Sequence, residues 1–90
     1  MTWGPYGPTW LVELAREQVP DEAWLPNALS LCTTGRVESP AYIHFVDPSS
    51  PEWQFETSLE LQSPVHGWIV LDVLRGYRIG GVEFVDKIEA

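Results

Sequence analysis

The chain has 90 residues, a formal net charge of −8, and 44% hydrophobic and 20% charged residues. This length and composition are typical of one small domain, spanning residues 1–90, and not of a disordered chain. The negative charge disfavours direct nucleic-acid binding, because few cations are available to replace phosphate counterions. The sequence has neither the basic, apolar start of a signal peptide nor an apolar run that could span a bilayer, so we expect a cytoplasmic protein.

An irregular N-terminal arm is predicted for residues 1–8, where two glycines and two prolines interrupt regular structure. A helix is predicted next, with Thr9 as its N-cap and its end near Val19, because apolar residues recur there at helical spacing. Pro20 ends this helix, since proline removes a backbone donor and clashes with the preceding turn. Residues 21–25 are expected to add one further turn.

After Pro26, apolar and polar residues alternate with a period of two, which favours a strand over residues 28–33. A turn and a loop are predicted from Thr34 to Pro40. A second strand, rich in aromatic residues, is expected from Tyr42 to Val46. After a proline-rich loop a third strand begins at Trp53, where apolar and polar residues again alternate.

The C-terminal third contains a nearly continuous apolar stretch, residues 68–74, which favours a buried strand. A helix that begins a few residues earlier is the alternative. The Gly80-Gly81 pair indicates a turn or a bulge, residues 82–85 a last strand, and residues 86–90 a frayed end.

A lone helix followed by several strands predicts an α+β fold: one N-terminal helix packed on a small antiparallel sheet of about four strands. No internal repeat or domain linker interrupts it. The predicted core consists of Trp10, Leu14, Leu29, Leu31, Ile43, Phe45, Ile69, Leu71, Val73 and Phe84.

Candidate catalytic residues are few. Cys32 is the only cysteine, so an internal disulfide is excluded, and its place in an alternating stretch favours a small buried apolar group. His44 precedes Asp47 by three residues, and a small enzyme or ligand-binding domain could use both with Glu56. We favour a strand histidine that faces solvent or a partner, because no oxyanion or substrate anchor accompanies it. His66 is interpreted in the same way, and no catalytic residue is assigned.

Metal and cofactor motifs are missing from the sequence. It has no paired-cysteine, His-Glu-x-x-His or calcium-loop spacing, and the Gly80-Gly81 pair lacks the neighbours of a phosphate loop. We therefore expect neither a metal nor a cofactor. Arg75 and Arg78 form the only local basic spot, which is interpreted as charge balance. The alternative is an anion contact or a patch that reaches the acidic face of a second copy, so a homodimer stays open.

From residue 37 to residue 74 the chain has no Lys or Arg, yet it carries six acids and five large aromatics. Such a segment indicates a surface that meets a basic partner and repels nucleic acid and anionic lipid. Trp53 is the candidate anchor, because tryptophan is enriched at interface hot spots. The alternative is that Trp53 and Phe55 are core. The predicted partner-binding residues are Asp47, Glu52, Trp53, Phe55, Glu56 and Glu60.

The stretch LAREQVPDEAWLP, with the later loop DPSSPEW, resembles small acidic, uncharacterised bacterial domains of the immunity-protein and anti-defence type. The resemblance covers roughly residues 1–55, and no catalytic residues carry over from it. The residues on which it rests are Pro20, Trp24, Asp47, Pro48 and Trp53.

The resemblance implies a bacterial or phage origin and an inhibitory role. Together with the charge pattern it predicts an inhibitor that blocks a basic surface of a partner protein: a toxin, or a nucleic-acid-binding defence complex as in anti-CRISPR inhibition. No direct contact with nucleic acid or membrane is expected. A structural accessory subunit, or a ligand-binding domain without catalysis, is the alternative.

Overall fold

The computed structural model describes residues 2–88 and shows an α+β fold with two α-helices and an antiparallel sheet of six strands. The predicted class is correct, whereas one helix and about four strands were expected. In chain order the elements are β1 Gly4–Pro5, α1 Thr9–Gln18, α2 Trp24–Ser30, β2 Thr34–Ser39, β3 Tyr42–His44, β4 Phe55–Ser63, β5 Gly67–Leu74, β6 Arg78–Phe84 and the 3-10 helix η1 Val85–Lys87.

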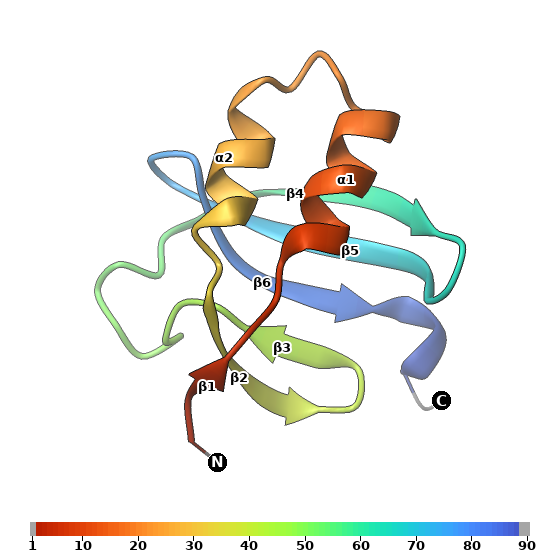
Figure 1. Ribbon diagram of the computed structural model, residues 1–90. Coiled ribbons are helices and arrows are strands. Elements are labelled where there is room, and N and C mark those ends of the chain that lie inside the picture. The colour runs from red at the N-terminus through yellow and green to blue at the C-terminus, as the bar shows by residue number, and fades with distance from the viewer. Residues whose placement is uncertain (1, 89–90) are drawn as a thin grey trace.

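The strands lie in the order β1-β2-β3-β6-β5-β4, and every neighbouring pair is antiparallel. The strands β4, β5 and β6 form a meander, and β3 joins it along the far side of β6. Both helices lie on the same side of the sheet (Figure 1). This arrangement buries one sheet face under the helices and leaves the other face without a helix.

Helix α1 confirms the predicted amphipathic pattern. Leu11, Leu14 and Ala15 are buried, and the charged residues between them are exposed. Thr9 is the first helical residue and not the cap, which is a correction. The main-chain oxygen of Pro8 accepts the first hydrogen bonds of the helix, and no side chain caps it.

Helix α2 replaces the strand that was predicted for residues 28–33. Leu25, Ala28 and Leu29 are buried, and their spacing of three and four residues places them on one helical face. Pro26 lies in the first turn, where its missing N–H costs nothing because that donor has no partner within a helix. Leu31, predicted to be core, follows the last turn and is 81% exposed.

Strand β2 occupies most of the stretch for which a loop was predicted. It pairs with β3 over Arg36, Val37 and Ser39, with a bulge at Glu38. The N-terminal arm is also not entirely irregular, because β1 pairs Gly4 with Gly35. These strands are short and mostly exposed, so they lack the apolar alternation that makes a strand recognisable in sequence.

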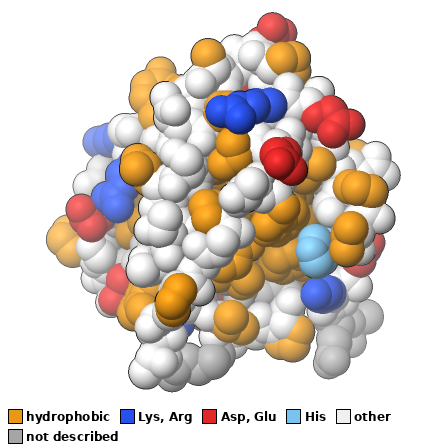
Figure 2. Space-filling view, in the orientation of Figure 1, with side chains coloured by type: hydrophobic (Ala, Val, Ile, Leu, Met, Phe, Trp, Pro, Cys, Tyr) orange, Lys and Arg blue, Asp and Glu red, His pale blue; other side chains and the backbone are white. Residues whose placement is uncertain are grey.

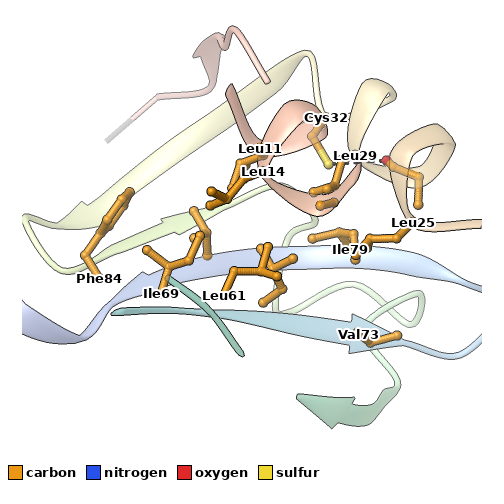
Figure 3. Packing of buried hydrophobic residues seen from close by; sticks show 14 residues of the cluster. Leu11, Leu14, Leu25, Leu29, Cys32, Leu61, Ile69, Val73, Ile79 and Phe84 are labelled. Atoms are coloured by element: carbon orange, nitrogen blue, oxygen red, sulfur yellow. Dashed lines mark hydrogen bonds between the residues drawn. The ribbon is translucent and has the colours of Figure 1, made fainter. Parts of the chain in front are cut away.

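The core lies between the helices and the sheet, where Leu11, Leu29 and Ile69 are fully buried (Figure 3). Most of the predicted core is confirmed. Trp10, Ile43 and Phe45 are only partly buried and pack against the cluster. The predicted core residues within the cluster are Leu14, Leu29, Ile69, Leu71, Val73 and Phe84.

Strand β5 follows the prediction closely, whereas β6 begins at Arg78, before the predicted start at residue 82. Residues 68–74 belong to β5, so the alternative helix is excluded. Gly80 is the extra residue of a bulge opposite Asp72 and Val73 in β5. Part of the predicted frayed end is the helix η1, while residues 89–90 lie outside the described part. Within residues 2–88, no helix has the length and apolar character needed to cross a membrane.

Candidate functional site

The sheet face without helices, here called the open face, gathers acidic and aromatic side chains. Strand register defines its members, because alternate positions on a strand, and directly paired positions on neighbouring strands, project to the same side. Glu38 belongs to it through its contact with His44. The open face comprises Arg36, Glu38, Tyr42, His44, Ser58, Glu60, Gln62, Trp68, Val70, Asp72, Gly81 and Glu83, and at one end of the sheet also Phe55, Leu74 and Arg78.

The centre of the open face is a hydrogen bond from the Tyr42 hydroxyl to Asp72 Oδ2. Gly81 lies beneath the tyrosine, and a Cβ atom there would come within 2.7 Å of Cε1 and Cζ of the ring. Burial, and then the hydrogen bond to Asp72, raises the pKa of Tyr42 above its ordinary value of 10.0, and the charges of Asp72, Glu83 and Glu38 add to this. The hydroxyl therefore stays protonated and acts as a donor at neutral pH.

His44 is enclosed beside this pair and is only 5% exposed. Its ring centroid lies 4.5 Å from that of Tyr42 and 5.7 Å from that of Trp53. Nε2 lies 3.3 Å from Glu38 Oε2, but neither ring nitrogen makes a hydrogen bond within residues 2–88. Glu38 thus contacts His44 without hydrogen-bond geometry.

The open face is acidic. Its carboxylates are those of Glu38, Glu60, Asp72 and Glu83, and its cations are Arg36 and Arg78, of which Arg78 is paired with Glu52. The guanidinium of Arg36 lies over the ring of Trp3, 5.4 Å from the centroid. At this distance the indole attracts the cation by a cation–π interaction. The acids of the face are therefore largely uncompensated by neighbouring cations.

Two of the predicted partner-binding acids have partners within the chain. Asp47 Oδ1 accepts hydrogen bonds from the main-chain nitrogen and the hydroxyl of Ser49, at 2.9 and 2.8 Å. These bonds hold the pKa of Asp47 below its ordinary value and stabilise the loop. Glu52 forms an ion pair with Arg78 at 3.0 Å, as expected if Arg78 balances charge.

The other four predicted residues lie at one end of the sheet and along β4. Trp53 is half-buried, and a Cβ atom on Gly80 would come within 2.7 Å of its ring, so the indole covers the sheet instead of projecting from it. Phe55 is 56% exposed, and Glu56 and Glu60 are exposed as well. The structure therefore leaves Phe55, Glu56 and Glu60 accessible to a partner.

The structure does not bring His44, Asp47 and Glu56 together into a catalytic arrangement. His44 lies on β3, and Glu56 lies on β4, which is three strands away. Neighbouring strands are about 4.8 Å apart, so this separation is roughly 14 Å. Asp47 is bonded to Ser49 and not to His44.

Cys32 and His66 are packed into the domain. Burial raises the pKa of the Cys32 thiol to about 12, so the thiol is protonated and unreactive at neutral pH. Cys32 follows α2 instead of lying in the predicted strand, but it is buried as expected. The ring of His66 lies 5.0 Å from that of Trp10 and 5.3 Å from that of Phe84.

A groove of about 630 Å³ lies between α1 and the β4–β5 turn. Glu13 and Glu17 form one wall, Trp10 and His66 contribute aromatic rings, and Pro64 lies on the turn. Hydrophobic side chains gather in the middle of the helix side of the molecule, with a histidine near the edge (Figure 2). Carboxylates beside aromatic rings suit a ligand that carries a positive charge.

The predicted partner-binding residues left out Tyr42, Trp68, Asp72 and Glu83 of the open face, although the first three belong to the acidic, aromatic segment that the sequence indicated. A signal existed for β3, where Tyr42 and His44 alternate with apolar residues. Trp68 and Asp72 were assigned to a strand buried on both faces, because the apolar run from Trp68 to Leu74 is interrupted only once. The alternation of residues within that run, and not its largely apolar character, shows which side chains reach the open face.

Comparison of the chain with protein-family models, with curated proteins and with solved structures finds no match. The resemblance to immunity-type domains thus remains a prediction. Function must accordingly be inferred from the geometry of the open face, the strand β4 and the groove.

Proposed function

We propose that the chain is a protein-binding inhibitor without catalytic activity, which places its open face against a basic surface of a partner protein. The supporting observation is the set of four carboxylates, Glu38, Glu60, Asp72 and Glu83, on one helix-free sheet face whose two arginines, Arg36 and Arg78, contact Trp3 and Glu52 instead. The strands fix the spacing of these charges, so little entropy is lost when they meet complementary charges.

Trp68 is the proposed aromatic anchor of this interface in place of Trp53. It lies on the open face and is 48% exposed, whereas Trp53 is packed over Gly80. Interfaces combine aromatic anchors with a polar rim, and the neighbouring Gln62 and Glu60 supply such a rim. A basic channel in a toxin or in a nucleic-acid-binding defence complex matches this chemistry.

The test compares two double charge reversals that change the net charge equally. Glu60→Lys with Glu83→Lys alters the open face, and Glu13→Lys with Glu17→Lys alters the exposed side of α1. Wild type and both variants are used to capture proteins from a bacterial host lysate, and association rates with the captured protein are then measured. We expect the open-face variant to lose capture while the α1 variant retains it. Equal capture by both variants would contradict the proposal.

The second candidate function is the binding of a small cationic ligand in the groove beside α1. The observation that favours it is that Glu13 and Glu17 share a face of α1 with Trp10, whose ring packs beside that of His66, around one hollow. A polyamine such as spermidine should then raise the Tm of the wild type, and Glu13→Gln with Glu17→Gln should remove that increase. No increase in Tm at millimolar spermidine counts against this function.

A further inference from the structure

The sheet ends in two unlike edge strands. Strand β4, at one edge, runs over nine residues, Phe55–Ser63, and contains neither proline nor lysine. Strand β1, at the other edge, has two residues and includes Pro5, which has no N–H to donate. A long edge strand without proline or lysine offers a row of main-chain donors and acceptors to another strand.

Gln18 shows which main-chain groups of β4 point away from the sheet. Its side-chain Oε1 accepts a hydrogen bond from the Gln62 N–H at 2.8 Å, and its Nε2 donates to the Gln62 carbonyl. Antiparallel pairing alternates between residues bonded to the neighbour and residues directed outward. Ser58 and Glu60 are therefore directed outward like Gln62, while Leu59 and Leu61 bond to β5.

The side chain of Gln18 thus occupies the place of an added strand at one end of β4. At Ser58 and Glu60 no such group is present: within residues 2–88, no hydrogen bond reaches their main-chain atoms from outside the sheet. The half of β4 that is distant from Gln18 is the part that can pair.

The acidic side chains near β4 determine which kind of strand can pair with it. Glu56 and Glu60 are exposed on β4, and Asp72 lies on β5 opposite Ser58. Two β4 strands related by a twofold axis would bring the two Glu60 side chains together as opposed or diagonal neighbours, and like charges in those positions destabilise a sheet. A strand with Lys or Arg beside Glu60, and an apolar side chain beside the half-buried Leu59, has the opposite effect.

We infer that β4 binds an extended segment of the basic partner by strand addition, through the main chain of Ser58 and Glu60, and that cationic and apolar side chains alternate in that segment. The inference rests on the proposed function, because it assigns a binding mode to the same basic partner. Main-chain hydrogen bonds supply the affinity in this mode, and the alternating side chains supply the selectivity.

The probe is a short blocked peptide of alternating lysine and valine, added to the isotopically labelled full chain. Amide hydrogen exchange at Ser58 and Glu60 should slow about tenfold when free peptide is at about ten times its Kd. The same peptide N-methylated at alternate residues on its pairing edge should give no protection. Protection by both peptides alike would overturn strand addition.

Two variants test the donor on the protein side. Ser58→Pro removes the outward N–H of residue 58 but leaves the hydrogen bonds to β5 intact, so it should abolish peptide binding. Ser58→Ala keeps this N–H and should bind the peptide as the wild type does. If Ser58→Pro does not fold, the N-methylated peptide alone decides the matter. Peptide-induced shifts confined to Trp68 and Glu83, without protection at Ser58, would overturn this inference while leaving the proposed function standing. Failure of the charge-reversal test above would instead remove the proposed function.

Discussion

On the open face, the ring of Tyr42 lies directly over Gly81. Any side chain at position 81 would collide with the tyrosine ring, 2.7 Å from the new Cβ, and would separate the hydroxyl from Asp72. Glycine is thus required at this position by close approach, and not by backbone conformation, since its φ is not positive. The hydrogen bond on which the open face is centred depends on one missing methyl group.

We expect Gly81→Ala to destabilise the protein by about 1–3 kcal/mol, the usual cost of overpacking. Denaturant unfolding measures this change. Gly7→Ala is the matched control, because a Cβ there meets nothing within 4 Å, and it should change stability by no more than about 0.5 kcal/mol. A Gly81→Ala variant as stable as the control would show that Tyr42 can move without cost.

The raised pKa of Tyr42 predicts a loss of stability at alkaline pH. The folded state keeps the Tyr42 proton above pH 10, where the unfolded chain has released it, so the stabilisation is complete below pH 10 and declines as pH rises. Each such group contributes a slope of about −1.4 kcal/mol per pH unit in that range. Tyr42→Phe should flatten the decline of the unfolding free energy above pH 10.

Tyr77→Phe is the control for this experiment, because Tyr77 is 68% exposed. Its unfolding free energy should follow the wild-type pH profile. At neutral pH, Tyr42→Phe should itself cost about 0.5–1.5 kcal/mol, since Asp72 loses a donor. Identical profiles for Tyr42→Phe and wild type would contradict the assignment of the proton to Tyr42.

At the scale of elements, α2 is where the sequence was most misleading. Its seven residues, Trp24–Ser30, contain a proline and follow another, and the alternation from Ala28 to Thr33 is typical of a strand. In so short a stretch, apolar residues fit both the helical spacing of three to four and the strand spacing of two. The helix forms because it buries Leu25 and Leu29 against the sheet. Such tertiary information is not contained in local periodicity.

The helical assignment predicts unequal effects of two alanine substitutions in residues that the strand hypothesis places on the same face. Leu29 is fully buried and Leu31 is 81% exposed. Leu29→Ala should cost about 2–5 kcal/mol, and Leu31→Ala no more than about 0.5 kcal/mol. Both values come from denaturant unfolding, and comparable losses for the two variants would favour the strand.

The long elements were predictable and the short ones were not. Helix α1 and the strand β5 have enough residues for their apolar pattern to be distinctive, and both were predicted within about two residues of their bounds. Strand β2 is held by pairing with β1 and β3 and has few buried side chains, so hydrophobicity gave no sign of it.

The exposure of the predicted partner-binding residues could be anticipated only in part. Phe55 and Glu60 are exposed, as a binding role would require. Asp47 and Glu52 proved to be bonded within the chain, because hydrogen bonds to Ser49 and an ion pair with Arg78 depend on loop geometry. Sequence spacing reports which charges exist, whereas the fold decides which are already satisfied.

At the scale of the whole molecule, the net charge of −8 predicts how the chain meets a cationic partner. Salt screens the attraction between exposed opposite charges, with a screening length of about 10 Å at 0.1 M salt and about 3 Å at 1 M salt. The association rate with the captured partner should therefore fall steeply between these concentrations, while dissociation changes less. Stopped-flow mixing measures both rates, and an association rate that does not depend on salt would refute electrostatic attraction.

The two edges of the sheet also have a consequence for assembly. A filament of stacked copies needs each molecule to offer a pairing strand at both ends, and β1 offers only Gly4–Pro5, one residue of which has no donor. This molecule can therefore take up a strand at β4 but not at β1, so copies cannot be joined edge to edge into a continuous sheet. If the inferred strand addition at β4 is correct, one molecule takes up one partner segment, and the expected stoichiometry is one to one.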